Sequence, residues 1–485
     1  MDLYISKPGV MSSAGNNIDQ LWASVISGNQ SGIKKVKACN GEDFFAARIE
    51  EKTLSPSSAI YDMKIMRIED AALKQISDDV NAAIKKYGCE RLAVCVGSCD
   101  NGTQFSVEGH RSFFSDGKFP NNYTLEIQGA DYVATFAAQK FGIKGPVNAF
   151  STACSSSAGA IIKAAEMIIS GIVDAALVGG VDIASDTTLI GFNSLEAISF
   201  EITNPFSKNR HGITLGDGAA FFLLTKEVLS QDSIKLLGWG ESADAYHATS
   251  PDPNGEGAKK AIQKALKSAS LLERDIDYIN LHGTGTKFND SMEAKAIDSI
   301  FGSKEIKVPV STTKPITGHT LGAAAALELS ICWKTLVENS HKKVDNFKLP
   351  LQVWDGKQDE KLPFLNIVSK TKGVSKENLT DTENRDLTGM GEDSKELFEK
   401  EKERMYKEIC DGFSMYLCTP KDIPEKFSVS EIKRLSMEDE DPDAAVVFAG
   451  TEDELYVPSF ARQGKEDEPN ILPGAVRGTA IHRIM

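Results

Sequence analysis

The chain has 485 residues, of which 41% are hydrophobic and 25% charged, and this composition is typical of a globular protein with more than one core. No apolar run reaches the roughly 18 residues that a membrane-spanning helix needs, and the start lacks the basic and apolar regions of a signal peptide. The net charge of −15 argues against a protein that binds nucleic acid by neutralising phosphates, so we expect no nucleic-acid partner and no membrane insertion.

The eight cysteines are scattered along the chain without the regular spacing of a disulfide framework. This predicts free thiols and a reducing, cytoplasmic setting. Cys95 and Cys99 lie four residues apart in "AVCVGSCD", but no second pair of ligands accompanies them. We therefore interpret Cys95 as a buried strand residue rather than as part of a zinc site.

Short apolar runs alternate with helical patterns up to about residue 370. The runs predict strands at 91–98, 174–182 and 219–226 in the first half, and at 234–241, 277–284 and 365–370 in the second. A helix is predicted over 257–269, where Ala261, Ile262, Ala265 and Leu266 share one face. Such alternation indicates an α/β fold in which helices cover parallel sheets.

The stretch "NAFSTACSSSAGAIIKAAEM", residues 148–167, places Cys154 just before a helix of small residues. A thiol at a helix N-terminus faces free backbone N–H groups and the positive end of the helix dipole. That setting favours the thiolate, which is the nucleophilic form. The alternative is a small core residue, since most cysteines are buried and inert.

Two of the seven histidines lie in turns rich in Gly and Thr at the boundaries of predicted elements. His282 follows a predicted strand in "INLHGTGTKFNDSMEA", and the ends of parallel strands are where α/β folds build their sites. His319 precedes another helix of small residues in "STTKPITGHTLGAAAALE", five residues after Lys314. We interpret four other histidines as structural: His110, His211, His247 and His341.

A faint internal echo links the two halves. "STACSSSAGAII" resembles "ITGHTLGAAAAL", with Cys154 and His319 each placed after a Thr and a small residue and before a helix. If the fold consists of two similar halves, these helix starts would occupy equivalent positions.

Residues 375–485 differ from the rest, because their net charge is −11 against −4 for residues 1–374. We expect an acidic, partly disordered extension with one helix, for which Asp393 would be the cap and Glu396 its capping-box partner. The apolar stripe of that helix would be Phe398, Met405 and Ile409.

Residues 1 to about 370 resemble the β-ketoacyl-[acyl-carrier-protein] synthases, condensing enzymes with the thiolase fold. The matching stretches are "TACSSS", "NPFSKNRHGITLGDGAA", "HGTGTKFND" and "TTKPITGHTLGAAAALE". The resemblance implies two similar βαβ-type halves: 1–230 with the nucleophilic cysteine and 231–372 with both catalytic histidines, followed by an unrelated segment, 373–485.

The resemblance also implies a role for each matched residue. Cys154 would take the acyl chain, and His282 and His319 would bind the thioester oxygen of a malonyl group as it loses carbon dioxide. Lys314 and its partner Glu328 would support His319, and Asp290 and Glu293 would support the loop after His282. No metal or organic cofactor is needed, because the phosphopantetheine arm arrives on the acyl carrier protein, and the family's usual assembly is a homodimer. We expect the condensation to belong to fatty-acid elongation, and the sequence alone does not separate this from a polyketide or aryl-polyene pathway.

The sequence departs from the family after residue 370. Family members end on a motif like Asn-Ser-Phe-Gly-Phe-Gly-Gly, which supplies an oxyanion donor, and neither 410–417 nor 444–450 matches it. Without those last strands one sheet would have an open edge, and a lost oxyanion donor costs roughly a hundred- to a thousandfold in rate. The alternative to an active synthase is therefore a truncated or chimeric one that at most binds a partner.

The tail resembles the C-terminal region of a helicase–nuclease family in "KFSVSEIKRLS" and in residues 456–485, where His482 would match a metal-site histidine. The acidic ligands of such a site do not follow, and the chain contains no phosphate-binding loop. We expect neither nuclease nor ATPase activity and explain the tail as a fusion. A DNA-processing role, which binding to duplex ends would test, is a third interpretation.

Overall fold

The computed structural model describes residues 2–369 except 60–61, 122, 231, 248–249, 303–307, 341 and 343–346. The expectations for residues 373–485, including the helix capped by Asp393 and the match at His482, lie outside the described residues. None of the helices in the described part is long and apolar enough to cross a membrane.

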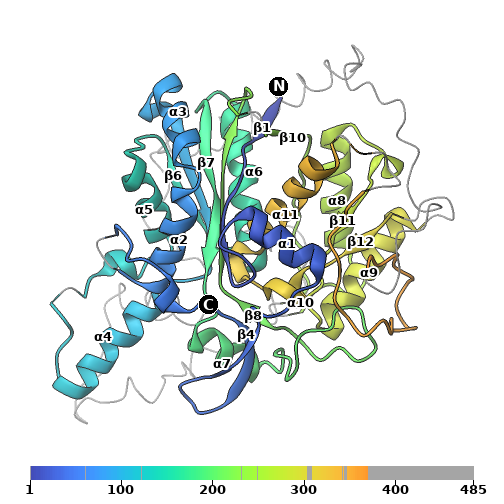
Figure 1. The fold of residues 1–485 in the computed structure, drawn as a ribbon, viewed down its shortest axis with the longest axis horizontal. Helices are drawn as coiled ribbons and strands as arrows, with labels where there is room; N and C mark the ends of the chain where they lie inside the picture. Colours follow the sequence, from blue (N-terminus) through green and yellow to red (C-terminus); the bar gives the residue numbers. More distant parts are fainter. Residues whose placement is uncertain are drawn as a thin grey trace, which may run out of the picture. The chain divides into compact units, whose positions relative to one another are not determined.

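A seven-stranded mixed sheet forms the centre of the first half (Figure 1). Its strands are β1 (Leu3–Ile5), β2 (Gly9–Ser12), β5 (Leu92–Gly97), β6 (Val147–Phe150), β7 (Ala175–Asp182), β9 (Gly218–Thr225) and β10 (Ile234–Leu236). The order is β10-β1-β9-β7-β5-β6, with β2 also paired to β9. Only the pairs β5–β6 and β5–β7 are parallel.

The expectation of parallel sheets is thus wrong for most of this sheet, because β9 runs antiparallel to β7, β1 and β2, and β10 runs antiparallel to β1. Hydrophobic runs show that a strand is buried on both faces, and that is true of parallel and antiparallel central strands alike. The chain direction depends on the connection between strands, which the run does not encode.

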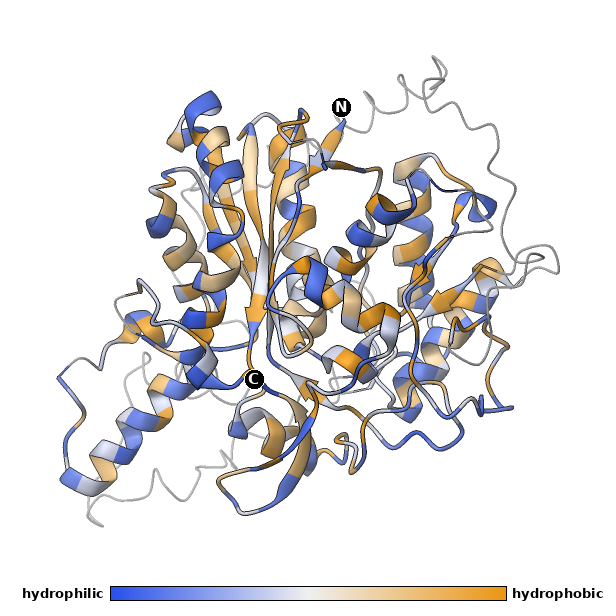
Figure 2. Ribbon diagram, viewed as in Figure 1, coloured by the Kyte–Doolittle hydropathy of each residue, from blue (hydrophilic) through white to orange (hydrophobic). Residues whose placement is uncertain are grey.

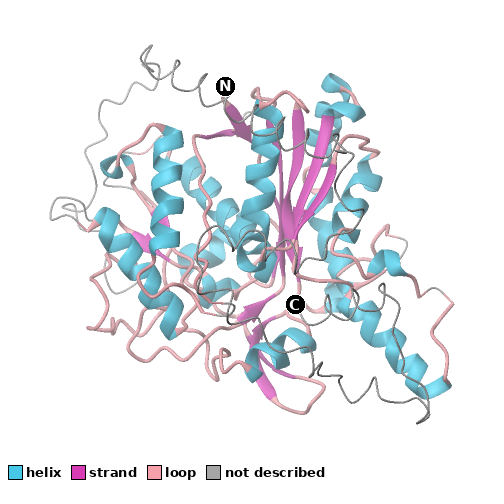
Figure 3. Cartoon of the chain, turned by 180° about the vertical axis from the view of Figure 1, so that it is seen from behind, coloured by secondary structure: helices cyan, strands magenta, loops and turns pink. Residues whose placement is uncertain are grey.

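Helices cover both faces of the sheet (Figures 1 and 3). One face carries α2 (Lys64–Lys74), α3 (Ser77–Tyr87) and α5 (Tyr132–Phe141), and the other carries α1 (Ile18–Ser27), α6 (Ser156–Ile169) and α11 (Ala324–Asn339). Side chains of β5 alternate between these two cores, with Val94 and Val96 in the first and Ala93 and Cys95 in the second. The strands accordingly form an apolar centre (Figure 2).

The second half contains a smaller parallel pair, β11 (Ile279–Asn280) and β12 (Val310–Ser311). Ile367 adds a parallel bridge to Val310 on the other side of β12. A third sheet consists of β3 (Lys34–Lys37), β4 (Asp43–Ala47) and β8 (Leu215–Gly216). The remaining α-helices are α4 (Thr103–Asp116), α7 (Asp186–Ser194), α8 (Glu256–Ala269), α9 (Lys287–Phe301) and α10 (Lys314–Thr317). The 3-10 turns are η1 (Glu51–Thr53), η2 (Cys89–Arg91), η3 (Leu125–Ile127), η4 (Ala153–Ser155), η5 (Glu273–Asp275) and η6 (Leu321–Ala323).

Most predicted elements are confirmed. The strands predicted at 91–98, 174–182 and 219–226 are β5, β7 and β9, and the helix predicted at 257–269 is α8. Cys95 is buried on β5, as expected. The strand predicted at 234–241 is only three residues long, because Ile234–Leu236 pairs with β1 of the first sheet and the chain then leaves the sheet. The boundaries at 230 and 372 stay predictions.

Candidate active site

Cys154, His282 and His319 come from distant parts of the chain to one place. Cys154 lies in η4, at the entrance to α6; His282 follows β11; and His319 lies between α10 and η6. The Cys154 Sγ atom and one ring nitrogen of each histidine all lie within 4.8 Å of one another. The two imidazole rings are nearly perpendicular, at 85°, with centroids 5.1 Å apart.

The helix starts that carry this site have the same backbone geometry. Ala153 opens η4 with φ 53°, Leu321 opens η6 with φ 50°, and each 3-10 turn passes directly into a long helix. The two helix starts are therefore alike, as expected, but Cys154 and His319 do not occupy the same position in them. The turn places Cys154 opposite Gly322, because both are the second residue of their 3-10 turn.

Glycines at the ends of β5 and β7 let both helix starts approach the sheet. A Cβ atom on Gly97 would lie 2.2 Å from the Ser157 backbone nitrogen of α6. A Cβ atom on Gly180 would lie 2.9 Å from the Ser157 side chain and 3.1 Å from the Cα atom of Ala323 in η6. Side chains at these two positions would force the helix starts away from the sheet.

Hydrogen bonds fix the protonation of His319. The backbone N–H of Leu321 donates to Nδ1 of His319 at 3.0 Å, so that nitrogen is the acceptor and Nε2 carries the proton of the neutral ring. Burial lowers the pKa of His319 well below its usual value, and the Lys314 ammonium lowers it further. At neutral pH His319 is a neutral donor from Nε2.

His282 is arranged in a similar way. Its Nδ1 lies 3.3 Å from the Lys314 ammonium, a group that can only donate. Its pKa is also well below the usual value, first because of burial and then because of Lys314 and His319. The ring consequently presents its remaining proton at Nε2, and the site holds two neutral N–H donors beside one thiol.

A cysteine and two histidines are also the kind of set that binds zinc. The positive Lys314 side chain beside His282 opposes a cation there, because like charges close together in a buried site repel each other strongly. The arrangement fits donors to a developing negative charge better than metal ligands.

Lys314 and Glu328 form a buried ion pair behind the histidines, joining α10 to α11. The Lys314 side chain is 1% exposed and the Glu328 side chain 17%. Lys314 is therefore not a surface charge. The sequence assigned it to His319, but its ammonium contacts Nδ1 of His282, while Nδ1 of His319 accepts the Leu321 N–H instead.

Replacing Glu328 by alanine is expected to lower the free energy of unfolding by about 3 kcal/mol, because it leaves the Lys314 ammonium buried without its counter-charge. Urea denaturation measures this change. Glu227→Ala, which breaks the exposed pair with Lys86, is the matched control and should leave the urea midpoint unchanged. Equal midpoints for the two variants would contradict the expectation.

Glu293 and Asp290 hold the loop that carries His282. Glu293 accepts the backbone N–H groups of His282 at 2.6 Å and Gly283 at 2.8 Å. Asp290 accepts those of Phe206 at 2.8 Å and Gly285 at 3.1 Å. Burial raises the pKa of Asp290 to about 6 and that of Glu293 to about 7, while the backbone donors act in the opposite direction.

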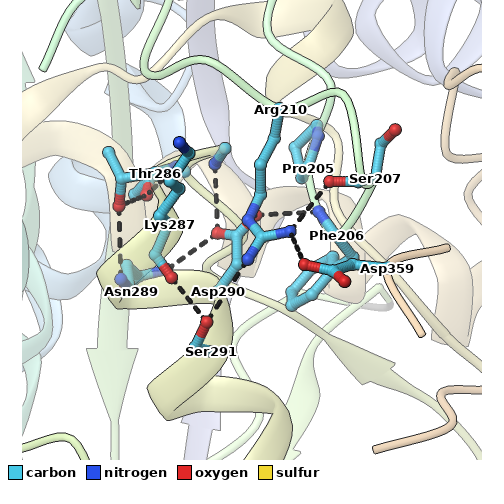
Figure 4. A network of polar contacts seen from close by, with 12 residues as sticks. Pro205, Phe206, Ser207, Arg210, Thr286, Lys287, Asn289, Asp290, Ser291 and Asp359 are labelled. Atoms are coloured by element: carbon cyan, nitrogen blue, oxygen red, sulfur yellow. Dashed lines mark hydrogen bonds and ion pairs between the residues drawn. The ribbon is translucent and has the colours of Figure 1, made fainter. Parts of the chain in front are cut away.

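Arg210 and Asp359 extend this network, and sequence reasoning missed both (Figure 4). Nη1 of Arg210 donates to Asp359 at 2.8 Å, and its Nε lies 3.9 Å from the Asp290 carboxylate. Arg210 is buried, so it connects the 204–210 segment to α9 from inside. An arginine among the small and apolar residues of "NRHGITLGDGAA" was the available signal.

The thiol of Cys154 differs from the expectation. Burial raises its pKa above the ordinary value, and this effect exceeds the opposing influence of Lys314 and of the backbone N–H of Cys154. The prediction that the helix N-terminus favours the thiolate is wrong here, because desolvation of the negative sulfur outweighs the helix dipole. At neutral pH Cys154 is a thiol.

The alkylation rate of Cys154 with iodoacetamide is therefore expected to rise with pH, about tenfold for each pH unit, and not to level off below pH 9. The reagent can reach the thiol, since Cys154 is only half-buried. Peptide mapping separates Cys154 from the exposed Cys39, which serves as the internal control. A plateau near pH 7 would show that the helix N-terminus and Lys314 prevail over burial.

Comparisons with known proteins agree on one family. Residues 8–228 match the model for the N-terminal domain of the β-ketoacyl synthases, and residues 234–348 match the model for their C-terminal domain. A 3-oxoacyl-[acyl-carrier-protein] synthase 2 from Coxiella burnetii is 30% identical over 370 residues, covering 72% of this chain and 89% of the relative. The protein of the same name from Vibrio cholerae is 31% identical over 357 residues, covering 69% of this chain and 86% of the relative.

Solved structures give the same picture. The ketosynthase ApeO in complex with its chain length factor ApeC, from Xenorhabdus doucetiae, matches with a TM-score of 0.69 and 37% identity over 76% of this chain and 91% of the matched chain. The ishigamide ketosynthase/chain length factor matches with a TM-score of 0.66 and 25% identity, over 76% of this chain and 92% of the matched one.

Proposed function

Since the chain belongs to the β-ketoacyl synthase family, we propose that Cys154, His282 and His319 perform its condensing reaction. The fold is thiolase-like, and the enzyme is a condensing acyltransferase of fatty-acid or polyketide chain extension. The observation that carries the residue assignment is the convergence of one thiol and two neutral imidazoles, with Sγ and one ring nitrogen of each histidine within 4.8 Å of one another.

In the first step the Cys154 sulfur bonds to the carbonyl carbon of an acyl thioester delivered by an acyl carrier protein. The bond between that carbon and the carrier's sulfur breaks, and the thiol proton ends on the carrier thiol. The acyl chain is then held on the enzyme beside the two imidazoles.

In the second step the thioester oxygen of a malonyl group accepts hydrogen bonds from Nε2 of His282 and Nε2 of His319. The bond between the malonyl carboxylate and its α-carbon breaks, carbon dioxide leaves, and the electron pair forms an enolate that both donors stabilise. The enolate carbon attacks the acyl carbon, and the Cys154 sulfur leaves and takes up a proton from the solvent. The product is two carbons longer.

The other matched residues would support this chemistry without touching the substrate. Lys314, paired with Glu328, holds Nδ1 of His282 as an acceptor, so the proton stays on the catalytic side of the ring. Glu293 and Asp290 fix the backbone on either side of His282. In this proposal the enzyme needs no metal or organic cofactor, because the phosphopantetheine arm comes with the carrier protein.

We also propose a homodimer formed by the cysteine-bearing half. In the described sheet β6 is an end strand, its first residue Val147 is 41% exposed, and it leads directly to the Cys154 turn. A strand edge of this kind can pair with a second copy. Light scattering at micromolar concentration tests this: a dimer mass supports the proposal, and a monomer, or a dimer only with an added chain-length-factor-like protein, overturns it.

The cysteines in the described residues are free thiols: Cys39, Cys89, Cys95, Cys99, Cys154 and Cys332. Free thiols support the proposal that the protein works in a reducing compartment such as the cytoplasm.

The test of function is product formation by the full chain. The protein is mixed with an acyl-[acyl-carrier protein] and malonyl-[acyl-carrier protein], and mass spectrometry follows both the enzyme and the carrier-bound product. We expect an acyl adduct on the Cys154 peptide and a β-ketoacyl product two carbons longer. Folded protein that gives neither would favour the truncated, inactive synthase suggested by the absence of the terminal glycine-rich motif from the sequence.

A further inference from the structure

Asp182 ends the central strand β7, is 1% exposed and lies next to the site. Its Oδ2 accepts two backbone N–H groups, from Cys99 at 2.8 Å and from Gly322 at 2.6 Å. Its Oδ1 accepts the hydroxyl of Ser98 at 3.2 Å. One buried carboxyl group therefore joins the end of β5 in the first half to the η6 turn of the second.

On the nucleophile side the connection passes through Cys99. The thiol of Cys99 donates to the backbone carbonyl of Ala153 at 3.3 Å, and the Ser156 hydroxyl donates to the same carbonyl at 2.6 Å. Ala153 is the residue with φ 53° that directly precedes Cys154. Asp182 fixes the backbone of Cys99, and the thiol of Cys99 in turn hydrogen-bonds to the peptide between Ala153 and Cys154.

On the histidine side the connection passes through Gly322. The residue before it, Leu321, has φ 50° and donates its N–H to Nδ1 of His319. That bond keeps the His319 proton on Nε2. Because the N–H groups of Leu321 and Gly322 are successive in one 3-10 turn, a carboxylate that fixes one constrains the direction of the other.

The contact leaves no spare space. A Cβ atom on Gly322 would lie 2.6 Å from Oδ2 of Asp182 and 3.0 Å from the backbone nitrogen of Cys99. Only glycine allows this closeness of the two turns. The carboxyl is also deeply buried, which raises the pKa of Asp182 to about 8.

We propose that Asp182 is a positioning residue for the condensation, keeping the Cys154 turn and the His319 turn in register across the two halves of the fold. The proposal rests on the function proposed for Cys154 and His319. Asp182 does not touch the reacting atoms and acts through backbone N–H groups alone, so its hydrogen-bonding oxygen matters rather than its charge.

This predicts that asparagine at position 182 keeps the reaction rate and that alanine at this position does not. In Asp182→Asn the amide oxygen can take the place of Oδ2 and accept both N–H groups, while the amide nitrogen faces the Ser98 hydroxyl. In Asp182→Ala both N–H groups lose their acceptor inside the protein. Should the alanine variant fail to fold, Asp182→Ser, whose shorter side chain cannot reach both N–H groups, replaces it with the same expectation.

The rate of malonyl decarboxylation is measured per acylated Cys154, counted by intact-protein mass, so that a smaller folded fraction does not imitate a slower site. We expect Asp182→Asn to stay within about threefold of the natural protein, and Asp182→Ala to lose at least about tenfold in kcat with KM for malonyl-[acyl-carrier protein] unchanged. Asp70→Ala, which removes another buried carboxylate, on α2 and paired with Lys140, is the control and should lower stability without changing this rate.

A second readout does not depend on turnover. ¹⁵N NMR of ring-labelled histidine should show His319 with its proton on Nε2 in the natural protein and in Asp182→Asn, and a mixture of tautomers in Asp182→Ala. An alanine variant with an unchanged rate and tautomer, or an asparagine variant as impaired as alanine, would overturn the proposal. If the natural protein shows no acylation at all, the proposed function fails, while the NMR result still decides the role of Asp182.

Discussion

Cys154→Ala is expected to abolish acyl transfer and to slow condensation by at least about ten-thousandfold, because no other group in the site can form the thioester intermediate. In the described part of the chain the nearest other thiol is not placed to replace it: Cys99 is turned to the Ala153 carbonyl, and burial raises its pKa to about 12. Intact mass after incubation with the acyl donor measures the first effect, and product formation measures the second.

The control for this variant is Cys39→Ala, which removes an exposed thiol that is not part of the site and should leave both measurements unchanged. An acyl adduct of full occupancy on the Cys154→Ala protein would show that the acyl group is carried elsewhere. The assignment of Cys154 as nucleophile would then be wrong, whatever the rate.

His319→Ala should slow decarboxylation of malonyl-[acyl-carrier protein] by about a hundred- to a thousandfold, which is the usual effect of losing one donor to a developing oxyanion. It also leaves the Leu321 N–H without its acceptor. Carbon dioxide release measures the rate, and the acyl adduct on Cys154 should still form. His319→Gln keeps a donor near the position of Nε2 and should recover part of the rate.

His211→Ala is the matched control, since His211 lies on the surface against the Phe200 ring and takes no part in the site. If His319→Ala kept the full rate of decarboxylation while His282→Ala lost it, the oxygen would be held by one imidazole only. The symmetric role that the two Nε2 donors have in the proposed mechanism would then not hold.

Much of the site could be predicted because each of its residues lies at the boundary of an element. Each of Cys154, His282 and His319 has a small residue next to it, and small residues at the ends of strands and helices mark places where backbones approach closely. The strands β5, β7 and β9 could be predicted for a simpler reason, since buried central strands read as continuous apolar runs.

Other features depend on contacts between residues that are far apart in the chain. In the sequence Asp182 is only the last residue of a predicted apolar strand. Nothing there indicates its contact with Gly322, which lies 140 residues further on. The pKa of the Cys154 thiol likewise depends on how completely the two halves exclude water, and a helix N-terminus taken alone predicts the opposite direction. The equivalence of Cys154 with Gly322 follows from the backbone angles of the two turns, and the similarity of the two sequence stretches does not reveal these angles.

The place of β10 limits how the protein can be divided into fragments. Residues 234–236 follow the predicted first half in the chain, yet they hydrogen-bond to β1 and complete the sheet of that half. A fragment cut at residue 230 would lose this strand and expose the edge of β1. Complementation by two separately expressed pieces therefore needs a cut after residue 236. Because the first piece carries the nucleophile and the second carries both imidazoles, activity should return only when the two pieces associate.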